Sequence, residues 1–370
     1  MVRMNDELGL DADGPVLLVG GYGTVGTELA RLAAPSWPLT LTGRTVERGE
    51  ALAAETGARL RTWDLADPTP FRARVRAVVG VVNDPDDRVL RAAMAGGVPF
   101  ADVTRWTARM QRAATLGAMR APHSPVLLSS AWMGGVSSLV AAHLAAGVGG
   151  ADVVEVAIRW DVGDRAGVDS VEFMDRLGLD YEVVRDGRRH TVAPLSEVRR
   201  VRIGDDVTRV ARIDTPEQFT LPLTLGTTTA TTRIGFSSAA STAALLAVKR
   251  LGFFRWGRGD RFTPARRALL YAPGRGGTAR FRVDVTHDGR TSSATVTDPA
   301  GQAHLTAVGA LLALRRVLGT DGAPAPRGVA FPEQTPHPDR LPGDLDALGV
   351  TLRVSTGPVR ASGDVEGRAA

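Results

Sequence analysis

One short glycine-rich stretch near the N-terminus constrains the fold of this chain more than any other feature. It reads Gly21-Tyr22-Gly23-Thr24-Val25-Gly26 and follows the continuous apolar run 16–19. A helical pattern of apolar residues begins within it and continues over 24–34. A strand buried on both faces, a glycine-rich turn and a helix in this order are typical of a βα unit that binds a dinucleotide.

Each part of the motif has a separate expected role. Gly21 permits the tight turn, Gly23 lets the backbone approach a pyrophosphate, and Gly26 lets the helix pack closely on the strand. The backbone amides of Thr24 and Val25 then point at the phosphates from the positive end of the helix dipole. A glycine-rich turn that binds no ligand is the alternative that stays open.

The rest of the first 150 residues alternates strand and helix patterns. We predict further strands at 39–42, 60–63, 77–82, 100–103 and 126–129, with helices at 45–56, 70–75, 87–95 and 136–146. Such alternation predicts βαβ units and a parallel sheet. We therefore expect residues 15–150 to form an α/β domain, a doubly wound Rossmann sheet that binds a dinucleotide.

Beyond Gly150 the pattern changes to longer strands and hairpins. We predict strands at 153–160, 227–236, 279–286 and 291–297, hairpins over 181–192 and 201–213, and helices at 238–251 and 304–318 that cover one face. These elements predict a second, α+β domain on a mostly antiparallel sheet, which serves for substrate binding and dimerisation over 151–300. A chain of 370 residues has room for both domains.

The ends of the chain are assigned separately. We expect 1–14 to be a flexible N-terminus and 355–370 a disordered tail. Residues 301–354 hold a C-terminal helix and a proline-rich segment, with six prolines over 320–343, which we expect to run irregularly and which can return to the Rossmann domain.

The end of the second predicted strand carries an arginine where an NAD enzyme carries an acid. The sequence there is Gly43-Arg44-Thr45. Arg44 can bind a 2′-phosphate bidentately and Thr45 can add a hydroxyl, so we predict NADPH rather than NADH as the cofactor. A solvated arginine is the alternative. Asp64 is expected at the adenine edge, and Asn83 near the cofactor ribose and nicotinamide.

From Val16 to Asp64 the chain resembles the NADP-binding domain of the saccharopine dehydrogenase-like reductases. The resemblance continues through 78–83 and 101–104 and, less closely, through 130–135 and 298–301. The chain departs from the family pattern at Arg105-Trp106, where Gly-Glu is usual. The resemblance implies an NADPH-dependent oxidoreductase of specialised metabolism that transfers hydride to a C=N (imine) or C=C bond of a small or carrier-bound substrate, as imine reductases and trans-acting enoyl reductases do.

The candidate catalytic residues lie after the predicted strand 100–103. Asp102 is the first candidate for a proton donor and Thr104 for polarising the substrate; a structural Asp102 is the alternative. Tyr181 and Tyr271 are further possible donors. The residues expected to contact substrate are Trp106, Trp132, Met133 and Arg266.

Arg266 belongs to a segment, 253–275, in which six arginines alternate with aromatic residues and glycines. Two interpretations are a mobile lid over an anionic substrate and a solvated loop. The formal charge of +5 is spread along the chain, so we expect no nucleic-acid partner.

Other chemistries are excluded by composition. The chain has no cysteine, its histidines are dispersed, and we predict no metal site. No apolar stretch reaches the roughly 20 residues that span a membrane. We expect a cytoplasmic homodimer without a membrane partner. A catalytically inactive NADPH-binding sensor or scaffold is the alternative function.

Overall fold

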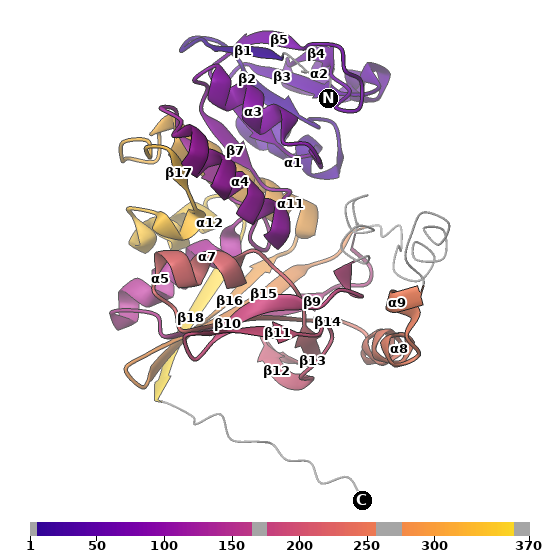
Figure 1. Cartoon of the computed structure of the whole chain (residues 1–370), viewed down its shortest axis with the longest axis vertical. Coiled ribbons are helices and arrows are strands. Elements are labelled where there is room, and N and C mark those ends of the chain that lie inside the picture. The colour runs from indigo at the N-terminus through magenta and orange to yellow at the C-terminus, as the bar shows by residue number, and fades with distance from the viewer. Residues whose placement is uncertain (1–5, 165–175, 257–275, 359–370) are drawn as a thin grey trace, which may run out of the picture.

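The chain folds around two seven-stranded sheets, which lie one above the other in Figure 1. The computed structural model describes residues 6–164, 176–256 and 276–358. The first sheet holds most of the N-terminal third and the second most of the remainder (Figure 1).

The first sheet is a Rossmann sheet, as predicted. Its strands are β2 (Val16–Val19), β3 (Leu39–Gly43), β4 (Arg59–Thr62), β6 (Ala77–Gly80), β7 (Phe100–Asp102), β8 (Val126–Leu128) and β17 (Val329–Ala330). They run parallel in the order β17-β8-β7-β6-β2-β3-β4. The chain proceeds outward from β2 on one side and then restarts on the other, so the topological switch point lies where β2 ends.

Helices connect and cover these strands. They are α1 (Thr24–Ala33), η1 (Val46–Gly49), α2 (Glu50–Thr56), α3 (Arg88–Ala95) and α4 (Thr107–Arg120). All four residues of β2 are at most 1% exposed, because both faces of the strand are covered. The apolar run 16–19 is therefore explained as expected, by a strand that is buried on both faces.

The second sheet is mostly antiparallel, also as predicted. Its order is β12-β13-β14-β9-β15-β16-β18, and only β14 and β9 pair in parallel. The strands are β9 (Val153–Trp160), β12 (Arg199–Ile203), β13 (Asp206–Arg212), β14 (Thr229–Phe236), β15 (Ala279–His287), β16 (Arg290–Asp298) and β18 (Thr351–Pro358). The hairpin β10 (Tyr181–Arg185) and β11 (Arg188–Val192) forms a separate two-stranded sheet.

Shorter helices surround this sheet. They are α5 (Val136–Val148), α7 (Glu217–Thr224), α8 (Ala239–Arg250), α9 (Phe253–Trp256) and α12 (Leu341–Asp346), with the turns η3 (Pro332–Gln334) and η4 (Pro338–Arg340). α5 contacts β15 and β16 on one side and η3 and η4 on the other. Covered from both sides, α5 is apolar around most of its circumference.

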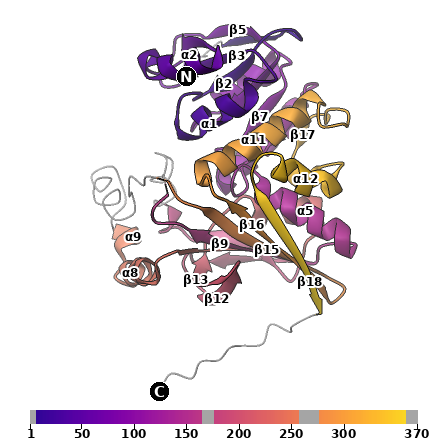
Figure 2. The ribbon, with the colours of Figure 1, turned by 180° about the vertical axis from the view of Figure 1, so that it is seen from behind.

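The long helix α11 (Gln302–Leu318) differs from its prediction. It was expected to cover the second sheet, but it packs beside α1 and over β6 and β7 of the first sheet (Figure 2). Small residues permit this approach: a Cβ added to Gly309 would lie 2.5 Å from the Gly134 carbonyl oxygen. The chain thus returns to the Rossmann sheet after completing β16, and β17 then extends that sheet beside β8.

The helix predicted at 70–75 is wrong. Arg72–Val75 is a strand, β5, which pairs in parallel with β1 (Glu7–Leu10). Arg72 and Arg74 are exposed whereas Val75 is buried, so the residues alternate with the period of a strand. The same pairing contradicts a flexible N-terminus over 7–10.

The C-terminal boundary also differs. β18 continues to Pro358 and forms an edge of the second sheet, so 355–358 are ordered rather than part of a disordered tail (Figure 2). Within the described ranges, no helix has both the length and the apolar character to cross a membrane.

Candidate functional site

The glycine-rich turn lies at the carboxyl end of β2 and has the predicted close packing. A Cβ added to Gly26 would lie 2.3 Å from the Gly20 carbonyl oxygen, and one added to Gly21 would lie 3.0 Å from Leu41 Cβ. Gly23 is exposed, and its nearest neighbour for an added Cβ is the Gly20 carbonyl oxygen at 3.3 Å. The backbone at Gly23 is therefore open to a ligand on the side away from the protein.

The N-terminus of α1 begins at this turn. Its N-cap residue is Gly23, and no side chain caps the first amides. No acidic residue occupies the first turn. A helix of ten residues that begins with uncapped amides at a topological switch point can accept a phosphate group.

Arg44 and Thr45 follow β3 and are both exposed. Arg44 makes no side-chain hydrogen bond or ion pair with any other residue in the described part of the chain. Its guanidinium group stands close enough to Tyr22 to lower the pKa of that phenol, although burial outweighs this effect and raises the pKa.

The side chain of Tyr22 packs against the segment 43–49, which begins at the end of β3, a role that the sequence analysis did not assign. A Cβ added to Gly43 would lie 2.5 Å from Tyr22 Oη, and one added to Gly49 would lie 2.7 Å from Tyr22 Cδ1. Both glycines leave room for the phenol ring. The signal in the sequence was an aromatic residue at the second position of the glycine motif, with Gly43 and Gly49 downstream.

Asp64 and Asn83 lie near the same edge of the sheet. Asp64 follows β4 and its Oδ1 accepts a hydrogen bond of 3.0 Å from the Ala66 amide, which closes a turn. Asn83 is half-buried between β6 and α3. Their expected contacts with the cofactor stay predictions.

Asp102 closes β7 and is 2% exposed. Its Oδ1 accepts hydrogen bonds from the Thr104 amide at 3.0 Å and from Ser130 Oγ at 3.0 Å, and its Oδ2 lies 3.2 Å from Arg105 Nε. Thr104 Oγ1 donates to the Val82 carbonyl oxygen at 3.1 Å. Both predicted catalytic side chains therefore already have protein partners.

Arg105 is the centre of a buried charge cluster. It is 4% exposed and pairs with Asp102 and with Asp87, which also lies 2.6 Å from Arg112 Nε. Burial lowers the pKa of Arg105, but the two carboxylates together raise it above its ordinary value. Arg105 is thus a cation that holds the loops after β6 and β7 together.

Trp106 is the N-cap residue of α4 and its ring lies close to two arginines. The guanidinium carbon of Arg109 is 4.3 Å from the indole centroid, and that of Arg176 is 5.2 Å away. Arg176 pairs with Asp214, which also accepts a hydrogen bond from Thr107 Oγ1. Burial and the charge of Arg109 lower the pKa of Arg176 to about 10. This cluster joins the first residues of α4 to the second domain.

Trp132 and Met133 lie in the loop after β8. Trp132 contacts Trp160 at a centroid distance of 6.1 Å, and Trp160 contacts Phe236 at 6.4 Å, both edge to face. Trp160 and Phe236 end the parallel strands β9 and β14, where they are partners in register. These half-buried rings form an aromatic wall, made by Trp132, Trp160 and Phe236, between the two domains.

Glu217 fixes the loop that carries Trp132. It is 1% exposed, and its Oε2 accepts a hydrogen bond from the Trp132 amide at 3.4 Å. Its Oε1 accepts from Ser137 Oγ at 3.3 Å and Thr232 Oγ1 at 3.2 Å. Burial raises the pKa of this carboxyl group. One buried side chain therefore connects the Trp132 loop, α5 and β14.

Arg266 and Tyr271 lie outside the described residues, as does most of segment 253–275. Phe253–Trp256, the start of that segment, forms α9. The two interpretations of the segment, a lid and a solvated loop, stay open.

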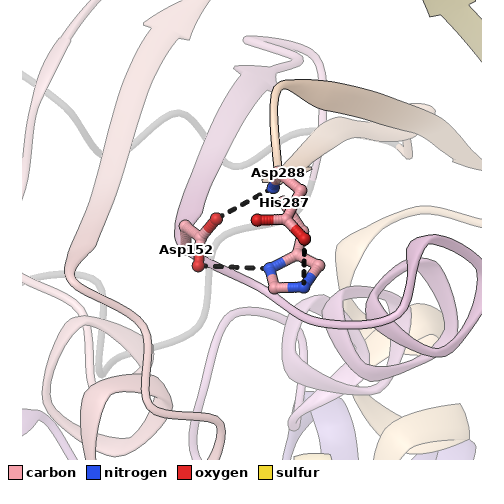
Figure 3. A group of neighbouring side chains, drawn as sticks. All are labelled: Asp152, His287 and Asp288. Atoms are coloured by element: carbon pink, nitrogen blue, oxygen red, sulfur yellow. Dashed lines mark hydrogen bonds and ion pairs between the residues drawn. The ribbon is translucent and has the colours of Figure 1, made fainter.

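A separate group of titratable side chains, Asp152, His287 and Asp288, is shown in Figure 3. Asp152 directly precedes β9, so the group lies at the opposite end of this strand from Trp160. Asp152 Oδ1 is 3.1 Å from His287 Nδ1, and Asp288 Oδ2 is 3.6 Å from His287 Nε2. The two carboxylates thus face different nitrogens of one ring, whereas metal ligands converge on one point (Figure 3). The group ties the β15–β16 turn to the start of β9.

His304 connects the first turn of α11 to the end of β16. Its Nδ1 lies 2.7 Å from Asp298 Oδ2, and Asp298 is fully buried. The hydrogen bond with Asp298 raises the pKa of His304, which burial alone would lower. A raised folded-state pKa stabilises the fold below the unfolded-state pKa, and this contribution is lost as pH rises through the folded-state value.

We therefore expect His304→Gln to cost about 1 kcal/mol of unfolding free energy at pH 5.5 and less at pH 9. Urea denaturation across this pH range measures the difference. His190→Gln, at an exposed position on β11, sets the baseline. A difference that grows with rising pH contradicts the prediction.

The chain matches no protein-family model and no curated protein. Among solved structures it is similar to apo saccharopine dehydrogenase (L-Glu forming) from Saccharomyces cerevisiae, with a TM-score of 0.63 at 14% identity over 93% of this chain and 100% of that one. A second similar structure is scyllo-inositol dehydrogenase from Lactobacillus casei with bound NAD(H), with a TM-score of 0.43 at 10% identity over 85% and 90% of the two chains. At these identities, the likeness to saccharopine dehydrogenase shows a shared two-domain fold.

Proposed function

We propose that this chain is an NADP(H)-dependent oxidoreductase that transfers hydride to a C=N or C=C bond of a small or carrier-bound substrate. One observation carries the proposal. An open glycine turn and an uncapped helix N-terminus lie at the switch point of a Rossmann sheet, and the adjacent strand β3 is followed by an exposed Arg44 that pairs with no other described residue. The fold shared with saccharopine dehydrogenase supports it.

The residues at this edge fit the cofactor. The pyrophosphate would lie over Gly23 and accept hydrogen bonds from the amides of Thr24 and Val25. The 2′-phosphate would bind Arg44 and Thr45, with Tyr22 behind them. An acidic side chain at this place would repel that phosphate, and the strand ends in Gly43 instead.

When bound, the nicotinamide supplies the hydride, and the protein orients the reactants and excludes water. The aromatic wall would form the apolar side of the substrate site, held in place by Glu217. We infer that Asp102 is a positioning residue rather than the proton donor, because it is ion-paired with Arg105 and accepts hydrogen bonds from Thr104 and Ser130. Thr104 keeps its predicted role, in which its side chain polarises the substrate.

Isotope transfer tests this function. NADPH deuterated at nicotinamide C4 is incubated with the protein and a panel of cyclic imines and enones, and products are examined by mass spectrometry. We expect one deuterium in the product from one of the two C4 epimers and none from the other. A panel that gains no deuterium although NADPH binds contradicts hydride transfer and favours the inactive sensor or scaffold.

A further inference from the structure

A cavity of about 380 Å³ lies where β8 and β17 end, and Ser129 and Phe331, which follow these two strands, contribute to its lining. α5, α11, α12 and the C-terminal segment after α11 enclose it. Four leucines, Leu127, Leu139, Leu312 and Leu341, contribute apolar surface to its lining. Of the residues predicted to bind cofactor or substrate, none that the structure describes lines it. A volume of this size accommodates a small metabolite.

The proline-rich wall of this cavity is held in a defined conformation. Arg316 donates to Asp321 Oδ1 at 3.0 Å and to the Pro324 carbonyl oxygen at 2.6 Å. Arg340 donates to the Asp321 carbonyl oxygen at 3.0 Å, and His143 Nδ1 lies 2.7 Å from the Pro338 carbonyl oxygen. The site is therefore largely formed before a ligand binds, and the protein loses little conformational entropy on binding.

Two residues of opposite charge that line the cavity have no side-chain partner among the described residues. Arg316 and Asp321 neutralise each other, whereas Arg315 and Asp344 make no side-chain hydrogen bond or ion pair with other described residues. Both side chains are only partly exposed. Partly buried charges are favourable when a partner of opposite sign reaches them, and here a ligand can supply both partners.

We propose that this cavity binds a small zwitterion with an apolar body, the chemistry of an apolar α-amino acid. The ligand carboxylate pairs with Arg315, its ammonium group pairs with Asp344, and its side chain contacts the four leucines of the lining. The site is separate from the one proposed for NADP(H), and the inference does not depend on that function. Ser129 lines the cavity and donates to the Gly134 carbonyl oxygen at 2.8 Å, so the ligand would lie against the support of the Trp132 loop.

Three matched probes measure separately how much the carboxylate and the ammonium group of the ligand contribute to its affinity. L-phenylalanine carries both charges, 3-phenylpropionate lacks the ammonium group, and phenethylamine lacks the carboxylate. Isothermal titration of the full chain with saturating NADPH present is expected to give one saturable site for L-phenylalanine. Each singly charged probe is expected to bind at least about tenfold more weakly, because one charged hydrogen-bonding group is lost.

Variants locate the binding. Leu312→Trp fills the cavity and is expected to abolish binding, and Arg315→Gln is expected to weaken L-phenylalanine at least about tenfold with little change for phenethylamine. Arg327→Gln removes an exposed cation that does not line the cavity and is the control for charge. Absence of saturable binding, unchanged affinity in Leu312→Trp and Arg315→Gln, or displacement of the probe by NADPH each overturns the proposal.

Discussion

Gly26→Ala is expected to destabilise the protein and to remove most of its affinity for NADPH. The added Cβ would lie 2.3 Å from the Gly20 carbonyl oxygen and 2.7 Å from the Gly21 carbonyl carbon. Both contacts are with backbone, so the turn or the helix must move. Overpacking of this kind costs about 1–3 kcal/mol, and displacement of the turn lowers affinity by about tenfold or more.

Gly147→Ala is the matched control, because Gly147 also lies inside a helix and a Cβ there would meet nothing within 4 Å. Helix propensity alone predicts a gain of up to about 1 kcal/mol for either substitution. Urea denaturation and NADPH titration of both variants separate the two effects. Equal stabilisation by both substitutions would contradict the close packing assigned to Gly26.

Arg105→Met is expected to cost about 3–5 kcal/mol of unfolding free energy, because it leaves the buried Asp102 carboxylate without a cation and removes one of the two cations at Asp87. Asp102 is 2% exposed and Asp87 is fully buried. Arg112 remains beside Asp87, but no other cation is paired with Asp102 among the described residues. The loops after β6 and β7 lose their common support.

Arg112→Met controls for the loss of one ion pair at Asp87. The Arg112 side chain is 46% exposed, so its loss is expected to cost at most about 1 kcal/mol. Chemical denaturation at neutral pH compares the two variants. A larger loss for Arg112→Met than for Arg105→Met would refute the central role of Arg105.

The fold of the first domain could be predicted because its signals are local. The apolar run before Gly21, the glycine spacing and the helical pattern lie within about twenty consecutive residues. The strand β5 could not be predicted in this way. Its partner β1 lies more than sixty residues earlier, and nothing near Arg72 indicates that pairing.

α11 illustrates a second limit. Its amphipathic pattern predicts a helix with a buried face, but not which sheet that face covers. The placement of α11 involves close contacts such as that of Gly309 with the loop at Gly134, where a side chain on Gly309 would not fit. The contact joins residues far apart in the chain and leaves no periodic signal.

Some residues of the candidate site could likewise be predicted from local sequence and others could not. Residues of the cofactor edge follow directly from the motif and from the ends of consecutive strands. Glu217, Trp160 and Phe236 could not be assigned, because their proximity to Trp132 depends on the register of β9 with β14 and on the place of α7. Sequence alone also left Asp102 with two roles, and its ion pair with Arg105 favours the structural one.

The central claim is that an NADP(H) site lies at the glycine turn and that Arg44 selects the 2′-phosphate. Fluorescence titration of the wild-type chain and of Arg44→Ala with NADPH and NADH tests it most directly. Arg120→Ala, at an exposed arginine at the end of α4, controls for loss of charge.

We expect the wild-type chain and Arg120→Ala to bind NADPH at least about tenfold more tightly than NADH. In Arg44→Ala this preference disappears through weaker NADPH binding, with NADH affinity unchanged. If neither nucleotide binds the wild-type chain, or if Arg44→Ala keeps the full preference, the account of this site is contradicted.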